Sequence, residues 1–301
     1  NGYEPKHSVL SRHLPRVTQI VQRLGLRPMM WGDMFFRALL PDGAYYTEGP
    51  LDFPPELLES IPEAMDIIYW DYYNEAPAMR NMFALNRRLG RPLLFAGCIR
   101  NNRGFGFSHA KTVQNTDLGL TLSKANGVRE VFATVWGDNC PESALMGILL
   151  GMQLYAEHGY AAEVRQADWY ARFAFCCHGE AGAFAALKYL DEIPEVLGED
   201  GNCLRTPVNP SRWLLWQDPL LGLLDANVPA GVGAHYARLA EDMARYGRES
   251  PAHAEMFAFY ATACKALSLK AELGVKLRAA YCAGDREALA SLADSAAGPA
   301  R

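Results

Sequence analysis

The first half of the chain alternates amphipathic helical periods with short apolar runs, and this alternation limits the fold more than any other feature. Helical periods at 77–89, 109–126 and 141–158 each end next to a glycine, as does an earlier one at 6–24. The apolar runs have no polar residue at every second position, which is typical of parallel strands covered on both faces. The pattern therefore predicts an α/β fold with a parallel sheet. The four predicted strands are 28–33, 66–72, 92–99 and 130–136.

Each predicted strand changes from aliphatic to aromatic and polar residues where it ends. In a (β/α)8 barrel the reaction centre is built at this carboxyl end of the strands, with contributions from several of them. An open doubly wound sheet gathers its ligand groups at one switch point instead, so four decorated strand ends favour the barrel. The residues concerned are Trp31, Asp33, Tyr69, Asp71, Tyr72, Arg100, Asn102, Trp136, Asp138 and Asn139.

Four βα units make half of such a barrel. We therefore expect residues 1–160 to form the C-terminal half of a (β/α)8 TIM barrel and residues 161–301 to form an α-helical domain. Helices are predicted there at 163–175, 179–191, 231–247 and 251–283. The aromatic segment 213–216 should pack against the last of these helices or form an exposed patch for self-association.

Charge and composition exclude some classes of function. The net charge of −5 offers no basic surface for nucleic acid, and no apolar run is long enough to span a membrane. The seven cysteines follow no disulfide framework, which favours reduced thiols and a cytoplasmic protein. A metal site at Cys176-Cys177-His178 would need a second ligand cluster, so we expect neither a metal nor a cofactor.

The aromatic strand ends suggest a carbohydrate site. Aromatic faces stack on the apolar faces of pyranose rings, while carboxylates and amides beside them hold the hydroxyl groups. Tryptophan and carboxylate occur together at Trp31-x-Asp33 and at Trp136-x-Asp138. The alternative is that these rings fill the top of the barrel or pack against the helical domain.

The segments MMWGDMFFRAL, IIYWDYY, LLFAGC, VFATVWGDNCPES and SRWLLWQDPLLGLLD resemble bacterial family 20 glycoside hydrolases. The similarity is greatest to exo-acting β-N-acetylhexosaminidases with a C-terminal helical domain. The resemblance implies that residues 1–160 supply strands five to eight of the barrel. It also implies a hydrolase of carbohydrate metabolism, a glycosidase that removes terminal β-linked N-acetylhexosamine with retention of configuration.

The resemblance implies substrate-assisted catalysis. An adjacent Asp-Glu pair at the end of strand four serves the family: the Glu is the general acid/base and the Asp orients the substrate's acetamido group. Only Asp191-Glu192 has this sequence here, and it lies in the helical region. We therefore expect the chain to be a fragment whose catalytic pair precedes residue 1, and which is inactive alone.

The resemblance assigns binding roles to individual residues. Trp31 corresponds to a wall of the acetamido pocket, and Tyr69 to the tyrosine that hydrogen-bonds and orients the acetamido oxygen. Asp71 belongs to the same region, Trp136 to the floor beneath the sugar, and Asp138 to a carboxylate for the outer hydroxyl groups. That last position is commonly Glu, so Asp138 reaches one methylene less far.

Weaker candidates are Asp33, Tyr72, Arg100 and Glu142. Family members commonly have Trp in the loop after strand seven, where this chain has Arg100 and Arg103; this indicates either altered specificity or drift in a loop. Two alternative functions stay open: a carbohydrate-binding relative without catalysis, and a retaining glycosidase with two carboxylates from among Asp33, Asp71 and Asp138. The expected partner is a glycan or glycoside containing N-acetylhexosamine, and the helical domain could support a homo-oligomer.

Overall fold

The computed structural model describes residues 4–102, 104–137, 142–193 and 209–297. The chain divides into two compact units. The first unit comprises Asn1–Cys98 with Thr112–Thr134, and the second comprises Ile99–Lys111 with Val135–Arg301. The domain boundary that the sequence predicts at residue 160 stays a prediction.

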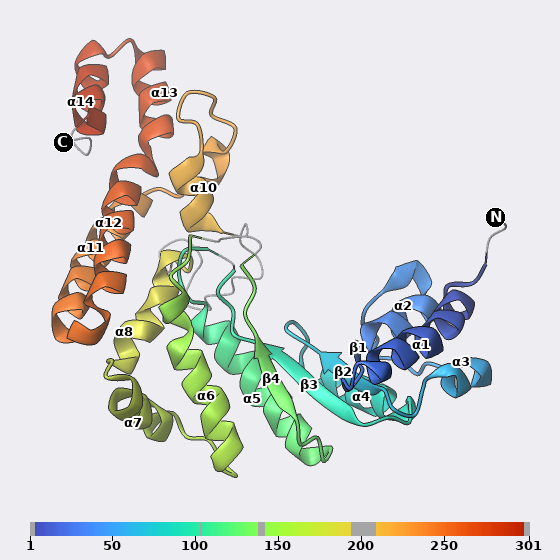
Figure 1. Ribbon diagram of the computed structural model, residues 1–301. Coiled ribbons are helices and arrows are strands. Elements are labelled where there is room, and N and C mark those ends of the chain that lie inside the picture. Colours follow the sequence, from blue (N-terminus) through green and yellow to red (C-terminus); the bar gives the residue numbers. More distant parts are fainter. Residues whose placement is uncertain (1–3, 103, 138–141, 194–208, 298–301) are drawn as a thin grey trace. The chain divides into compact units, whose positions relative to one another are not determined.

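The first unit contains a four-stranded parallel sheet in which the strands follow one another in chain order (Figure 1). This confirms the predicted α/β class and all four predicted strands. Each strand is shorter than predicted. The strands are β1 Met29–Trp31, β2 Asp66–Trp70, β3 Leu93–Cys98 and β4 Val131–Thr134.

Three predicted helices of this unit are present as α1 Lys6–Arg23, α4 Ala76–Arg88 and α5 His109–Ala125. A glycine with positive φ lies close after each of them: Gly25 at +72°, Gly90 at +70° and Gly127 at +71°. Such a residue ends a helix at little cost because it has no Cβ. The sequence pattern did not predict two short helices between β1 and β2, α2 Asp33–Leu39 and α3 Pro55–Ser60, nor the 3-10 turn η1 Pro41–Gly43.

One face of the sheet carries two rows of paired side chains, and it is curved. The rows, read from the register, are Trp31–Ile68–Leu94 and Trp70–Ala96–Phe132. The rings of Trp31 and Phe132 are 6.0 Å apart, although they belong to the first and last strands. In a flat sheet these strands would be separated by three strand spacings, or about 14 Å. The sheet therefore bends toward this face.

Helices α4 and α5 cover the other face. Phe83 of α4 and Phe95 of β3 have ring centroids 5.5 Å apart. A Cβ at Gly119 of α5 would lie 2.4 Å from the Phe95 ring, so only glycine allows this close approach. Successive residues of a strand point to opposite faces of the sheet, so the helix-covered face and the curved face carry different side chains. The two faces can therefore have different functions.

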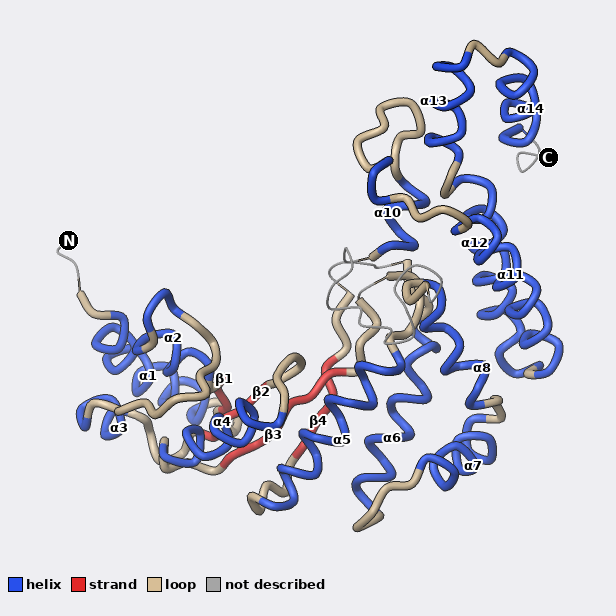
Figure 2. Tube along the Cα trace, turned by 180° about the vertical axis from the view of Figure 1, so that it is seen from behind, coloured by secondary structure: helices blue, strands red, loops and turns tan. Residues whose placement is uncertain are grey.

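The second unit is helical in the part of the chain that the structure describes beyond residue 144 (Figure 2). Its elements begin with η2 Leu145–Ile148, α6 Leu149–Tyr160, α7 Gln166–Cys177, α8 Ala181–Ala186 and η3 Leu187–Leu190. They continue with α10 Pro210–Trp216, η4 Asp225–Asn227, α11 Val232–Glu249, η5 Pro251–His253, α12 Ala254–Lys270, α13 Leu273–Ala283 and α14 Arg286–Ala297. None of the described helices is long and apolar enough to cross a membrane.

The prediction of one helix over 251–283 is wrong. Helix α12 ends at Lys270 and α13 begins at Leu273. The Gln217 side chain donates a hydrogen bond of 3.2 Å to the Ala271 carbonyl, and Glu272 accepts one of 2.9 Å from the Gly231 N–H. These contacts come from distant segments, so the periodicity of 251–283 could not show the break.

The aromatic segment 213–216 lies in α10. Its Leu214 is fully buried, whereas Trp216 is 64% exposed and is followed by exposed leucines. The sequence left open whether this segment is buried or forms an exposed apolar patch. The structure shows part of each, because Leu214 is buried and Trp216 is exposed.

Candidate functional site

The candidate site of the first unit lies where β1 and β2 end. Gly32 follows β1, and its N–H donates a hydrogen bond of 2.8 Å to the carbonyl of Ile68. A Cβ at Gly32 would lie 2.4 Å from Oδ1 of Asn86, so the position requires glycine. This close approach brings Asp33, the first residue of α2, to the edge of the sheet.

Trp70, the last residue of β2, lies at the centre of this site. Its indole Nε1 donates a hydrogen bond of 2.9 Å to Oδ1 of Asp33. Four tyrosine rings surround it, with centroids 5.0 to 6.5 Å from Trp70: Tyr45, Tyr46, Tyr72 and Tyr73. We call these five rings the aromatic cluster.

The aromatic cluster is partly open to solvent. Tyr45 is 40% exposed and Tyr73 is 49% exposed, whereas Tyr72 is buried. The guanidinium of Arg37 lies 4.5 Å from the centroid of the Tyr45 ring. Burial, with the Asp71 and Asp33 carboxylates, raises the pKa of Tyr46 well above its usual value, so this phenol is neutral. Its hydroxyl donates a long hydrogen bond of 3.5 Å to the carbonyl oxygen of Trp70.

Asp71, predicted as a binding residue, is completely buried. Its Oδ1 accepts hydrogen bonds of 3.0 Å from the N–H groups of Tyr73 and Asn74. Its Oδ2 accepts one of 2.6 Å from the Tyr69 hydroxyl and one of 2.8 Å from the Asn74 side chain. Four donors thus hold this carboxylate, and it fixes the turn on which Tyr72 and Tyr73 lie.

Tyr69 faces the helix-covered side of the sheet. Its ring packs edge-on against Phe83, at 4.8 Å between centroids, and against Phe95 at 5.6 Å. Only 2% of the residue is exposed, and burial together with Asp71 raises the pKa of its hydroxyl well above the usual value. Its single proton is donated to Asp71. The predicted contact of Tyr69 with an acetamido oxygen stays a prediction.

Trp31 lies on the opposite, curved face, in the row that includes Ile68. It is 37% exposed and packs on Phe132 of β4. The structure therefore brings Asp33, Trp70 and Tyr72 together, and Tyr69 with Asp71. Trp31 and Tyr69 belong to different faces of one sheet.

The remaining predicted site residues belong to the second unit. Trp136 is 43% exposed, while Arg100 is buried. Glu142 is half-buried, with its Oε1 3.6 Å from Nε of Arg212. Asp138 lies outside the described residues. The predicted meeting of Trp136 and Asp138 with the residues of the first unit stays a prediction.

Trp70 and Tyr73 belong to the aromatic strand ends from which the sequence suggests a carbohydrate site. Tyr45 and Tyr46 were not predicted as site residues. Tyr45-Tyr46 lies in a loop between two short helices, and two adjacent aromatic residues in a segment rich in Gly and Pro were the available signal.

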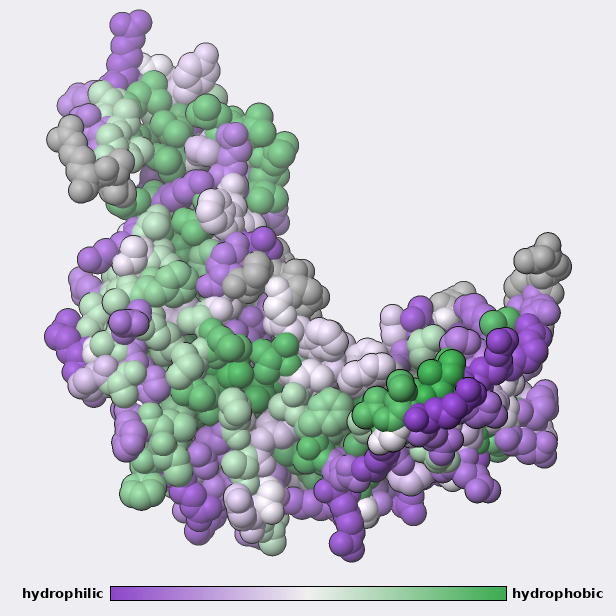
Figure 3. All heavy atoms as spheres, viewed as in Figure 1, coloured by the Kyte–Doolittle hydropathy of each residue, from purple (hydrophilic) through white to green (hydrophobic). Residues whose placement is uncertain are grey.

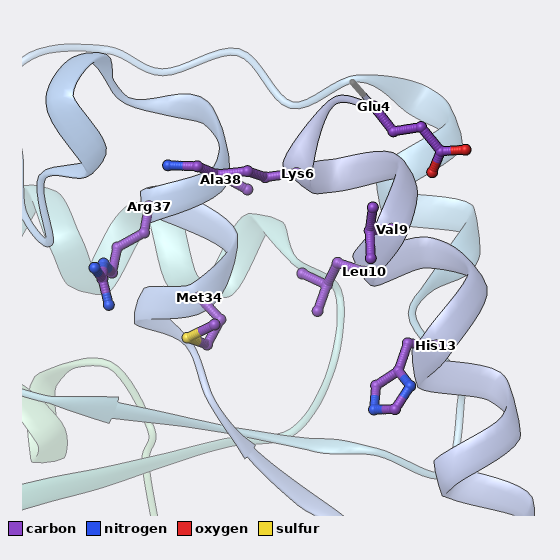
Figure 4. A pocket seen from close by; sticks show the side chains of 8 residues that line it. All are labelled: Glu4, Lys6, Val9, Leu10, His13, Met34, Arg37 and Ala38. Carbon is purple, nitrogen blue, oxygen red and sulfur yellow. The ribbon is translucent and has the colours of Figure 1, made fainter. Parts of the chain in front are cut away.

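A separate cavity of about 440 Å³ lies between α1 and α2 (Figure 4). Leu10 and Met34 face the space between the two helices, and Lys6, His13 and Arg37 lie around it. No predicted site residue lines this cavity. Across the described ranges no group of three or more His, Cys, Asp or Glu side chains could hold a metal ion.

Residues 182–298 match the family model described as Glycoside Hydrolase 20C C-terminal domain. The expected resemblance to family 20 glycoside hydrolases is confirmed for this region, which is similar to the C-terminal domain of that family. The match covers less than half of the chain. No curated protein matches the chain.

Proposed function

We propose that the chain is the C-terminal part of a glycoside hydrolase that removes terminal β-linked N-acetylhexosamine by substrate-assisted, retaining hydrolysis. The observation that carries the proposal is the Trp70–Asp33 hydrogen bond within the aromatic cluster, at the carboxyl edge of a parallel sheet. The family 20C match at 182–298 supports the hydrolase class. The acid/base Asp-Glu pair would come from a part of the protein that precedes residue 1.

The curved sheet supports the half-barrel. Its bend brings Trp31 of β1 toward Phe132 of β4, as closure into a barrel requires. Met29 is 52% exposed, Trp31 37% and Phe132 36%, so the curved face leaves apolar surface open at both outer strands. Four further strands would cover this surface and pair with β1 and β4.

The aromatic cluster is suited to a sugar ring. Exposed tyrosine faces can stack on its apolar face, while Asp33 and neutral phenols hold its hydroxyl groups. Trp31 and Trp136 would add further aromatic walls, and Asp138 a second carboxylate. Because the Tyr69 proton is already donated to Asp71, we propose that Tyr69 acts through Asp71, and that the exposed Tyr73 is the phenol that reaches the acetamido group.

The hydrogen bonding of Asp71 favours substrate assistance over a second catalytic carboxylate. A nucleophile must approach the anomeric carbon with a free lone pair. Asp71 is fully buried and its oxygens accept four hydrogen bonds, so it is suited to positioning. The substrate's own acetamido oxygen would then be the nucleophile.

The proposed partners are a glycan or glycoside with terminal N-acetylhexosamine and a second copy of the chain, bound through the helical domain. A cytoplasmic location is proposed from the thiols, because Cys176, Cys177, Cys264 and Cys282 form no disulfide within the described residues.

The test is steady-state kinetics of the full-length protein on an aryl N-acetyl-β-glucosaminide and on the matched aryl β-glucoside. The glucoside has no acetamido group, so we expect it to be nearly inert. Comparable turnover of both substrates would support a two-carboxylate glycosidase instead. Binding of N-acetylhexosamine without turnover would identify a carbohydrate-binding relative.

A further inference from the structure

The pair Asp191-Glu192 is not a catalytic pair, but Asp191 has a defined task in the second unit. It follows η3, and its carboxyl group is turned inward although the residue is only partly buried. We propose that Asp191 is a positioning residue, which fixes the main chain of the loop after β3 at Phe105 and Gly106 and so prepares this loop for a role in the substrate pocket. This inference rests on the proposed function.

Asp191 holds the loop through one hydrogen bond of its own and one relay through Ser211. Its Oδ2 accepts a hydrogen bond of 3.2 Å from the N–H of Gly106. Its Oδ1 accepts bonds from the N–H and the hydroxyl of Ser211, at 3.0 and 2.6 Å. The Ser211 Oγ in turn accepts one of 3.0 Å from the N–H of Phe105. The N–H groups of two successive loop residues, Phe105 and Gly106, are therefore bound by Ser211 and Asp191.

The loop sequence fits this arrangement sterically. A Cβ at Gly104 would lie 1.8 Å from the Asp191 carboxyl group, and a Cβ at Gly106 would lie 2.0 Å from the carbonyl oxygen of Leu187. Only glycines allow the main chain to approach so closely. The Gly-Phe-Gly sequence, which is too short for a dinucleotide motif, is thus explained by contact with η3.

The loop is also held from its other side. The Ser143 hydroxyl lies 2.8 Å from the carbonyl oxygen of Phe105 and 3.0 Å from Oδ1 of Asn101. The N–H of Ser108 donates a bond of 2.9 Å to the carbonyl of Arg100, which closes the loop. Both main-chain polar groups of Phe105 are therefore bound, and its buried side chain anchors the loop.

The consequence for the site follows from chain continuity. The loop leaves the carboxyl end of β3, and in a parallel sheet that end shares an edge with the ends of β1 and β2. Asn102 is the first polar side chain of the loop that is not fully buried, after the buried Arg100 and Asn101. A loop fixed by Asp191 would present Asn102 in one conformation, which favours binding because less conformational entropy is lost.

The test compares Asp191→Asn with Glu192→Gln in the full-length protein. Glu192 is the adjacent buried carboxyl group and has no hydrogen bond to the loop among those described, so it is the matched control. Ser211→Ala removes the relay and keeps Asp191, in case Asp191→Asn does not fold. The measurements are hydrogen exchange of peptides covering 100–108 and steady-state kinetics on the aryl N-acetyl-β-glucosaminide.

We expect Asp191→Asn and Ser211→Ala to speed exchange at Phe105 and Gly106 by roughly tenfold or more, because each loses a hydrogen bond to a charged group or its relay. Exchange in the β2 and β3 peptides should not change. KM should rise several-fold while kcat changes less, and Glu192→Gln should show neither the faster exchange of the loop nor the raised KM.

Unchanged exchange of the loop in both variants would overturn the proposal, and so would faster exchange with unchanged KM. Exchange needs no substrate, so it reports on the loop even if wild type hydrolyses no N-acetylhexosaminide. In that case the proposed function fails, and the role in the pocket fails with it. A faster-exchanging loop in Asp191→Asn would still show that Asp191 holds the loop.

Discussion

The indole Nε1 of Trp70 donates a hydrogen bond of 2.9 Å to Oδ1 of Asp33, joining the end of β2 to the start of α2. The two residues are 37 positions apart in the chain. The bond holds a carboxylate beside an aromatic ring, and this pairing of an apolar face with a hydrogen-bond acceptor is what recognition of a sugar needs. The neighbouring tyrosines complete the arrangement.

Trp70→Phe tests this relationship, because it keeps an aromatic ring and removes the N–H. A hydrogen bond to a charged group contributes about 1.5–3 kcal/mol, so we expect kcat/KM for the aryl N-acetyl-β-glucosaminide to fall by roughly tenfold or more, mainly through KM. Trp216→Phe, on the exposed end of α10, is the control and should leave the kinetics unchanged. Wild-type kinetics for Trp70→Phe would remove Asp33 from the site.

Tyr69→Phe and Tyr73→Phe separate a supporting phenol from a substrate-facing one. Tyr69→Phe leaves the buried Asp71 with three donors, so we expect a loss of stability of about 1–3 kcal/mol and a modest fall in kcat. Tyr73 is 49% exposed, so Tyr73→Phe should leave stability near wild type.

If Tyr73 donates to the acetamido oxygen in the transition state, its loss should lower kcat by roughly a hundredfold. Chemical unfolding and steady-state kinetics of both variants decide the matter. A hundredfold fall in kcat for Tyr69→Phe at unchanged stability would instead restore the direct contact predicted from the sequence.

Local patterns predicted the strands and most helices of the first unit because their causes are local. An apolar run followed by an amphipathic period and a glycine such as Gly90 specifies both the element and its end. The break at Ala271 has a distant cause, the side chain of Gln217, and no window around residue 271 contains it.

The candidate site was predictable only in part, for the same reason. The composition of the strand ends pointed to Asp33 and Tyr72. Tyr45 and Tyr46 reach Trp70 from a loop 24 or more residues away, and this proximity depends on the folded chain. The face of the sheet to which Tyr69 points follows from its pairing with Phe95 of β3, and this register cannot be read from the sequence.

Glu192 should make stability depend on pH. Burial raises its pKa to about 7, Lys188 and Lys111 oppose the shift, and Asp191 adds to it. Between about pH 4.5 and 7 the folded state holds a proton that the unfolded state has released. Stability from this group is therefore greatest at low pH and falls as pH rises through this window.

Glu192→Gln should flatten that dependence. Relative to wild type, the variant should gain stability between pH 4.5 and pH 8, by at most about 3 kcal/mol. Urea unfolding of the full-length protein at pH 4.5, 6 and 8 measures the effect, with the exposed Glu241→Gln as control. Parallel pH profiles for wild type and Glu192→Gln would contradict the prediction.

The loop after α10 should mediate self-association. Figure 3 shows hydrophobic surface over this loop, where Trp216, Leu220, Leu221 and Leu223 are 64 to 82% exposed. The loop is held in shape: Asp218 accepts hydrogen bonds from the N–H groups of Leu220 and Leu221, and Arg278 of α13 binds Asp225 at 2.6 Å. Exposed apolar side chains on a fixed loop are typical of an interface.

We expect wild-type protein to form a dimer in sedimentation experiments at micromolar concentration, and Leu221→Asp with Leu223→Asp to shift it to monomer. Burial of both leucines in a dimer would contribute about 1.5–3 kcal/mol for each side chain, and a buried aspartate would add a desolvation cost. Leu269→Asp, at an exposed position on α12, is the control and should leave the dimer intact. A monomeric wild type at high micromolar concentration would contradict the prediction that this loop mediates self-association.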